Sequence, residues 1–147
     1  MKTDLNHRLA RPVVLTLLIS LATLSGMKAD TPLEKNMERM KKACQELSLG
    51  LEKPQENSQA TYLTLAGIIK TSAIEARDLV PKSAAALPPD QKAAMIKSYK
   101  ESMGVFVGSV DGLIQNIKDS KWEEARKDIV GLKNEMKDGH REFRKDK

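Results

Sequence analysis

Aromatic residues and cysteine are both scarce in this 147-residue chain, and each scarcity excludes a class of protein. Aromatic residues make up 3% of the sequence, a proportion that disfavours a β-sandwich or β-barrel. The single cysteine excludes an internal disulfide framework and a cysteine-rich zinc site. Two histidines exclude most multi-histidine metal centres. Because Lys, Glu and Ala are abundant instead, the composition favours one helical domain.

The first 29 residues have the features of a secretory signal peptide. A basic leader precedes an uncharged stretch at residues 13–24, which is shorter than the ~20 apolar residues of a membrane span. We expect cleavage after Ala29, with Ala22 and Gly26 as alternative sites, and export to the periplasm. An uncleaved N-terminal anchor is the other interpretation. With cleavage, residues 30–147 form the domain and retain no stable membrane anchor.

Removal of residues 1–29 changes the charge balance of the chain. Four of the 25 basic residues and one of the 20 acidic residues lie in this segment, so the formal charge falls from +5 to +2. A nucleic-acid-binding protein needs a concentrated basic surface and often stacking aromatic residues, so we expect no nucleic-acid partner. His140 is the only histidine that remains, and any histidine chemistry would therefore take place there.

Apolar residues recur at helical spacing in four segments, at about residues 33–51, 58–80, 89–118 and 120–144. Thr31 and Pro32 predict the start of the first helix, and the spacing of Ser120 and Glu123 predicts a capping box at the start of the fourth. Residues 82–89 (KSAAALPP) are the one long connection. The predicted fold is all-α, an antiparallel up-down-up-down four-helix bundle. The predicted inward stripe of the second helix is Tyr62, Leu65, Ile69, Ala73, Ala76 and Val80.

Two further features of the sequence concern packing. Cys44 falls on the inward stripe of the first helix, so we expect a buried free thiol. Gly104, Gly108 and Gly112 share one face of the third helix, which predicts close packing inside the bundle, with a dimer contact as the alternative. We therefore expect a monomer or a weak dimer.

Segments near both ends of the predicted domain resemble the soluble cytochrome b562 family. Residues 33–38 (LEKNME) resemble the start of that family and residues 140–144 (HREFR) its closing segment. Between them, residues 107–111 (VGSVD) and 121–125 (KWEEA) also match its pattern. The resemblance covers the whole predicted domain apart from a longer connection between the second and third helices and adjustments near the first turn.

This resemblance implies a periplasmic electron-transfer protein rather than an enzyme. It implies one haem b, held without covalent attachment because the chain has no Cys-x-x-Cys-His sequence. Met37 and His140 would be the two axial ligands of the iron, and an unidentified redox partner protein would exchange the electron. The apolar residues that would surround the haem are Met40, Tyr99, Met103, Phe106 and Met136.

The chain differs from the family pattern at two positions. Met103 stands where an aromatic residue usually lines the haem, and Gly139 stands where an aromatic residue usually precedes the ligating histidine. These differences support an alternative function, a haem-free periplasmic helical bundle that acts as a binding or chaperone-like protein. An enzyme is the third possibility, and it lacks support because the domain has neither a second histidine nor a phosphate-binding glycine loop.

Overall fold

The computed structural model describes residues 30–144, and this part of the chain is all-α as predicted. The four long helices are α1 (Pro32–Glu52), α2 (Gln59–Arg77), α4 (Pro89–Lys118) and α5 (Trp122–Phe143). Two short elements join them, the 3₁₀ turn η1 (Glu56–Ser58) between α1 and α2, and α3 (Lys82–Ala85) between α2 and α4. The predicted signal peptide lies outside the described residues. None of the helices in residues 30–144 combines the length and apolar character needed to cross a membrane.

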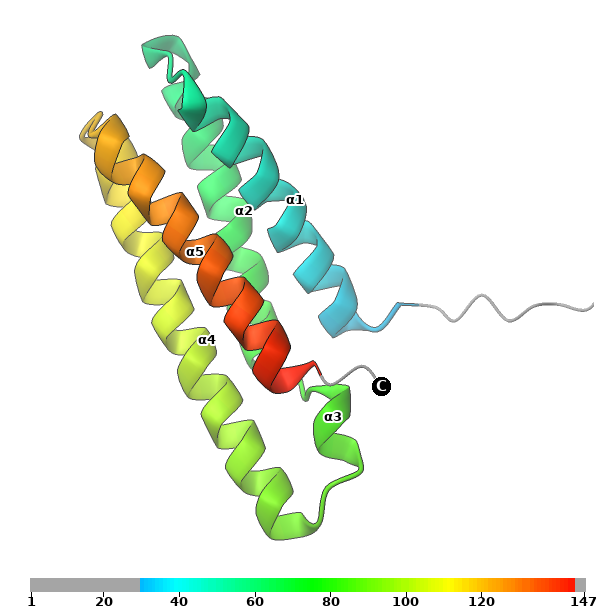
Figure 1. The fold of residues 1–147 in the computed structure, drawn as a ribbon. Coiled ribbons are helices and arrows are strands. Elements are labelled where there is room, and N and C mark those ends of the chain that lie inside the picture. Colours follow the sequence, from blue (N-terminus) through cyan, green and yellow to red (C-terminus); the bar gives the residue numbers. More distant parts are fainter. Residues whose placement is uncertain (1–29, 145–147) are drawn as a thin grey trace, which may run out of the picture.

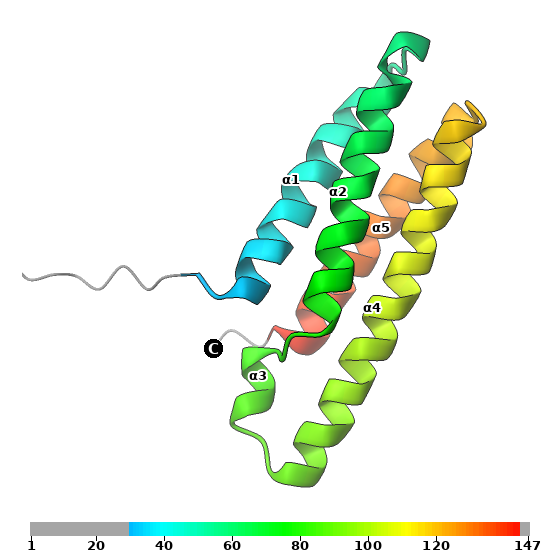
Figure 2. The ribbon, with the colours of Figure 1, turned by 180° about the vertical axis from the view of Figure 1, so that it is seen from behind.

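The four long helices form a closed ring of neighbours. α1 packs against α2, α2 against α4, α4 against α5, and α5 against α1. Successive long helices run in opposite directions, which confirms the four-helix bundle (Figure 1). The start of α1, the short helix α3 and the end of α5 lie at the same end of the bundle, here called the α3 end (Figures 1 and 2).

The start of α1 is fixed by a capping box, as Thr31 and Pro32 predict. The Thr31 hydroxyl accepts a hydrogen bond from the backbone N–H of Glu34 at 3.3 Å, and the Glu34 carboxylate accepts one from the backbone N–H of Thr31 at 2.7 Å. Two N–H groups that the helix itself leaves unpaired are thereby satisfied. The first turn of α1 is therefore held in one orientation, and Met37 lies in the turn that follows it.

The core is tightest at the end of the bundle away from α3. Leu47 and Leu51 of α1 and Leu113 and Ile117 of α4 are fully buried there. Cys44 is also buried and free, as its position on the inward stripe predicts. Towards the α3 end the inward stripes continue, but several of their members are only half-buried. The apolar stripes of the sequence thus continue past the part of the bundle in which the four helices pack closely together.

The structure corrects two expectations about the ends of the helices. Val80 is half exposed, because α2 already ends at Arg77, short of the Pro81 that prevents its continuation. α5 begins at Trp122 after Lys121 and lacks a side-chain cap, so Ser120 forms no capping box. Ser120 instead adopts a φ of 55° in the turn between α4 and α5.

The predicted packing role of the α4 glycines is wrong. Gly104, Gly108 and Gly112 are exposed, and a Cβ added at any of them would meet no atom within 4 Å. A different face of α4 packs against the core, and its buried residues are Tyr99, Met103, Phe106, Val110, Leu113 and Ile117. Equal spacing puts the glycines on one face of α4 but does not say which face is covered. The alternative of a dimer contact stays a prediction.

Candidate functional site

A cavity of about 870 Å³ lies at the α3 end of the bundle. Its walls come from α1, α4, α5 and residues 81–83. This volume is in the upper part of the range of cofactor and ligand pockets. All seven residues that the sequence singles out line this one cavity: Met37, Met40, Tyr99, Met103, Phe106, Met136 and His140. The bundle therefore brings together residues from both ends of the described chain.

The α1 wall of the cavity carries two methionines. Met37 and Met40 are three residues apart, so they occupy the same face of the helix on successive turns. Met40 is 2% exposed, whereas Met37, nearer the start of α1, is half-buried. The thioether of Met37 is therefore nearer to the mouth of the cavity than that of Met40.

The α5 wall carries Met136 and His140, which are four residues apart on one face and both half-buried. The Cys44 thiol of α1 donates a hydrogen bond to the Met136 sulfur over 3.7 Å. α1 and α5 run antiparallel, so one turn from this contact towards the α3 end brings Met40 opposite His140. The contact thus sets the register of the two walls.

Burial raises the pKa of the Cys44 thiol to about 11. The thiol consequently stays protonated at neutral pH and acts as the donor in its contact with Met136.

The α4 wall is formed by Tyr99, Met103 and Phe106, all of them buried. The Tyr99 hydroxyl donates a hydrogen bond to the backbone carbonyl of Ala76 in α2 at 2.8 Å. Its ring meets the ring of Phe143 edge-to-face, with centroids 5.4 Å apart. Burial raises the pKa of Tyr99 to about 12, so this side chain stays neutral and contributes an apolar ring to the cavity.

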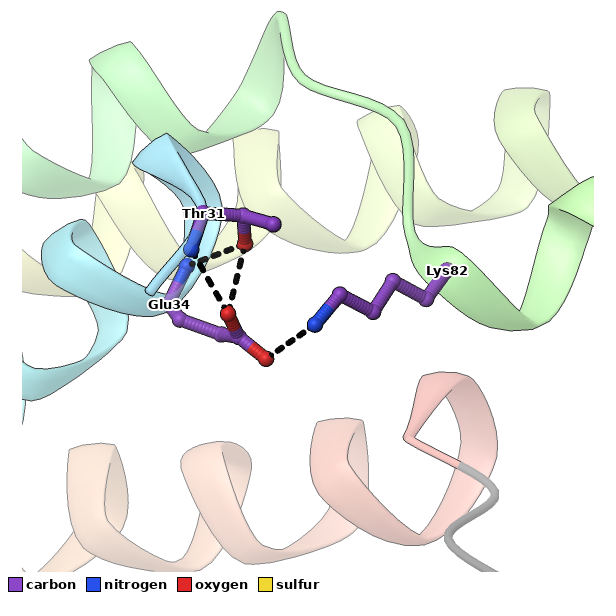
Figure 3. Close-up of polar contacts among 3 residues, drawn as sticks. All are labelled: Thr31, Glu34 and Lys82. Atoms are coloured by element: carbon purple, nitrogen blue, oxygen red, sulfur yellow. Dashed lines mark hydrogen bonds and ion pairs between the residues drawn. The ribbon is translucent and has the colours of Figure 1, made fainter. Parts of the chain in front are cut away.

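Helix α3 is tied across the α3 end by two polar contacts, here called the α3 clasp. The Lys82 ammonium donates to the Glu34 carboxylate at 2.5 Å, and the Ser83 hydroxyl donates to the Phe143 carbonyl at 2.5 Å. Figure 3 shows that Lys82 reaches the same carboxylate that caps α1 through Thr31. Lys82, followed by the capping hydrogen bonds from Thr31, lowers the pKa of Glu34 from 4.5 to about 2.

Lys82 and Ser83 are cavity residues that the sequence analysis missed. Their segment, residues 82–89, is predicted only as a connection because it carries no long periodic pattern. The topology contains a signal that could have identified them. In an up-down bundle the connection between the second and third helices lies at the same end as the start of the first helix and the end of the fourth.

Gly139 also lines the cavity, and a Cβ added there would meet no atom within 4 Å. The absence of a side chain at this position therefore leaves open space beside His140.

The charged side chains that line the cavity are mostly acidic, with six carboxylates and three basic groups. The carboxylates belong to Asp30, Glu34, Glu38, Glu135, Asp138 and Glu142, and the basic groups to Lys41, Lys82 and Arg144.

A comparison with protein-family models matches residues 32–144 to the cytochrome b562 family. The chain belongs to the cytochrome b562 family. The match begins at the first residue of α1 and ends just after α5, so it covers the whole described bundle and every cavity residue discussed above except Thr31 and Asp30. Membership of this family suggests a haem-binding helical bundle that carries electrons. A search of curated proteins gave no significant match.

Proposed function

We propose that the chain binds one haem b non-covalently in the cavity at the α3 end and carries single electrons in the periplasm. The observation that carries this proposal is that Met37 and His140, from opposite ends of the bundle sequence, line the same cavity. Membership of the cytochrome b562 family supports the nature of the cofactor. The periplasmic location rests on the sequence of residues 1–29.

The residues present fit a haem in donor type, size and polarity. The cavity offers an imidazole and thioethers, which are the side chains that ligate haem iron in electron-transfer cytochromes. Its volume of about 870 Å³ accommodates a large flat ligand, and the open space beside Gly139 adds room next to His140. Lys41 and Arg144, which also line the cavity, would supply positive charge for the carboxylates of the haem.

In this proposal Met37 and His140 hold the iron from the two facing helices α1 and α5. With Met37 and His140 both as ligands, a bound haem would supply one-electron transfer rather than oxygen chemistry. Met40, Met103 and Phe106 exclude water from the interior side of the cavity, which lowers the local dielectric and favours the reduced state. The α3 clasp holds the α3 end together around the site.

Reconstitution of the purified protein with haem tests the ligand assignment. Wild-type protein should give the absorption spectrum of a low-spin six-coordinate haem. Met37→Leu keeps the side-chain volume but removes the sulfur, and His140→Ala removes the imidazole, so each should abolish the His/Met signature. Met95→Leu is the matched control, because Met95 is the described methionine that does not line the cavity.

Two outcomes of the reconstitution would contradict the proposal. A protein that stays folded but yields no low-spin spectrum, or whose spectrum is unchanged in both Met37→Leu and His140→Ala, would contradict it. The first of these outcomes would favour the haem-free binding protein.

A further inference from the structure

The methionines of the chain are concentrated at one place. Five methionines fall within the described residues, and four of them line the cavity at the α3 end, the exception being Met95. The four come from three different helices: Met37 and Met40 from α1, Met103 from α4 and Met136 from α5. A haem held by Met37 and His140 uses only one of these sulfur atoms. The remaining thioethers therefore suggest a second chemistry for the same cavity.

Three donor groups line the facing α1 and α5 walls of the cavity: Met40 of α1, and Met136 and His140 of α5. Met136 and His140 lie on one face of α5, separated by a single turn. The Cys44–Met136 contact of 3.7 Å shows how closely sulfur atoms of the two helices approach, and its register sets Met40 opposite His140. Met37 lies a further turn towards the mouth of the cavity.

This donor set has a clear preference among metal ions. Two thioethers and one neutral imidazole are uncharged, and the sulfur donors are soft, which is the combination that selects Cu(I) over hard divalent ions. Within residues 30–144 no three His, Cys, Asp or Glu side chains are grouped so as to hold a metal. The uncharged sulfur and imidazole donors that line the cavity are the four methionines and His140.

The charge around the cavity favours a cation. Six carboxylates and three basic groups line it, although the formal charge of the whole chain is positive. A local excess of carboxylates at the edge of an apolar pocket raises the local concentration of cations.

We propose that the haem-free protein binds one Cu(I) ion through the sulfur atoms of Met40 and Met136 and a ring nitrogen of His140. Methionine side chains have three rotatable bonds, so Met40 and Met136 can converge on one ion without a change in the backbone. Cys44 acts as a positioning residue, because its thiol orients the Met136 sulfur through their hydrogen bond. Cu(I) and haem share His140 and exclude one another.

Anaerobic titration of haem-free protein with Cu(I), in competition with a chromophoric Cu(I) chelator, tests this site. Wild-type protein should take up one Cu(I) per chain. Met40→Leu, Met136→Leu and His140→Ala should each weaken Cu(I) binding at least about tenfold, since even the loss of an outer-shell partner costs about 10–100-fold in metal affinity. Met37→Leu and Met95→Leu should leave the affinity unchanged, whereas Cys44→Ala should weaken it without abolishing uptake, because the thiol only orients the Met136 sulfur.

A spectroscopic readout separates loss of ligands from loss of fold. Met→Leu substitutions conserve volume, and unchanged circular dichroism verifies that each variant folds. Addition of Ag(I), a redox-inert soft cation, should shift the NMR signals of the Met40 and Met136 methyl groups and leave that of Met95 in place, whereas Zn(II) should shift none. No uptake of Cu(I) by folded protein, wild-type affinity in both Met40→Leu and Met136→Leu, or loss of binding in Cys44→Ala would overturn the proposal.

The two occupants of the cavity depend on different methionines. Met37→Leu should lose the His/Met haem spectrum and keep Cu(I), because Met37 is a ligand only in the proposed haem site. Haem binding without Cu(I) uptake would overturn the copper site alone. Cu(I) uptake without haem binding would overturn the proposed electron carrier and leave the copper site intact.

Discussion

Gly50 and Gly139 both lie in helices, but their surroundings are opposite. A Cβ at Gly50 in α1 would lie 2.6 Å from a ring carbon of Tyr62, and that ring is held in place because the Tyr62 hydroxyl donates to the Gly50 carbonyl at 3.1 Å. A Cβ at Gly139 in α5 would meet nothing within 4 Å. Glycine is therefore required at position 50 because the Tyr62 ring lies too close for a side chain, whereas position 139 has room for one.

The two alanine variants should consequently change stability in opposite directions. Gly139→Ala should raise the free energy of unfolding of the haem-free protein by about 0.5–1 kcal/mol, because alanine is the better helix former. Gly50→Ala should lower it by about 1–3 kcal/mol, because the Tyr62 ring has to move. Urea denaturation of both variants measures the two effects. Equal shifts in the same direction would contradict this difference in packing.

Glu34 joins the start of α1 to α3, and its protonation should weaken both contacts. Its pKa is lowered from 4.5 to about 2 by Lys82 and Thr31, so its contribution to stability is complete above the unfolded-state pKa and is lost as the pH falls through the folded-state value. Thermal unfolding between pH 2 and pH 7 tests this. Glu34→Gln should unfold at a lower temperature than wild type at pH 6, and the two midpoints should converge near pH 2.

Glu38→Gln is the matched control for this pH dependence. Glu38 is exposed on the same helix, and its ion pairs with Lys41 and Lys42 are 4.0 Å long. Its variant should follow the wild-type curve because such surface pairs contribute little. A difference between wild type and Glu34→Gln that persists unchanged at pH 2 would show that ionisation of Glu34 is not its cause.

At the scale of elements, periodicity predicts the four long helices and their inward faces. Apolar residues spaced three and four apart fall on one side of a helix, and that side is the one that becomes buried. The ends and connections were harder to predict. Ser120 has the spacing of a capping residue, but the structure uses it in the turn at a φ of 55°, where its hydroxyl accepts from Gln59 at 3.3 Å. The competing contact comes from α2, which lies more than fifty residues away in sequence and which local spacing does not reveal.

Gln59 links the start of α2 to the end of α4, and its loss should destabilise the bundle. Its side-chain amide donates to the backbone carbonyls of Ile117 at 2.7 Å and Lys118 at 3.1 Å. These carbonyls belong to the last turn of α4, beyond the reach of the regular helical ladder, and that of Ile117 also accepts from the backbone N–H of Ser120 at 3.1 Å. Gln59→Ala should lower the free energy of unfolding by about 1 kcal/mol in chemical denaturation. The exposed Gln55→Ala should leave it unchanged, and equal effects of both would refute the capping role.

At the scale of the whole molecule, the cavity follows from the way the bundle closes. The core is fully packed at Leu51 and Leu113, whereas at the α3 end Met37 and His140 are only half-buried. The seven cavity residues that the sequence predicts come from the family resemblance. Periodicity alone does not identify them, since a lone histidine on a helix edge indicates little by itself. Lys82 and Ser83 escape prediction because their contacts depend on how three elements meet in space.

Haem should stabilise the folded chain as a whole. A ligand that binds only the folded state adds about 2.7 kcal/mol to the free energy of unfolding when its free concentration is 100 times its Kd. The thermal midpoint of wild-type protein should therefore rise with added haem, while that of His140→Ala should stay constant. An equal rise in both proteins would indicate that haem binds elsewhere than beside His140.

The absorption spectrum of the haem-reconstituted protein tests the central claim most directly. Wild-type protein and Met95→Leu should show the sharp Soret and α/β bands of a low-spin iron with His/Met ligation. Met37→Leu and His140→Ala should lose this signature while their circular dichroism remains helical. A folded wild-type protein without these bands, or an unchanged spectrum in both variants, would contradict the assignment of Met37 and His140 as the ligands of a haem in this cavity.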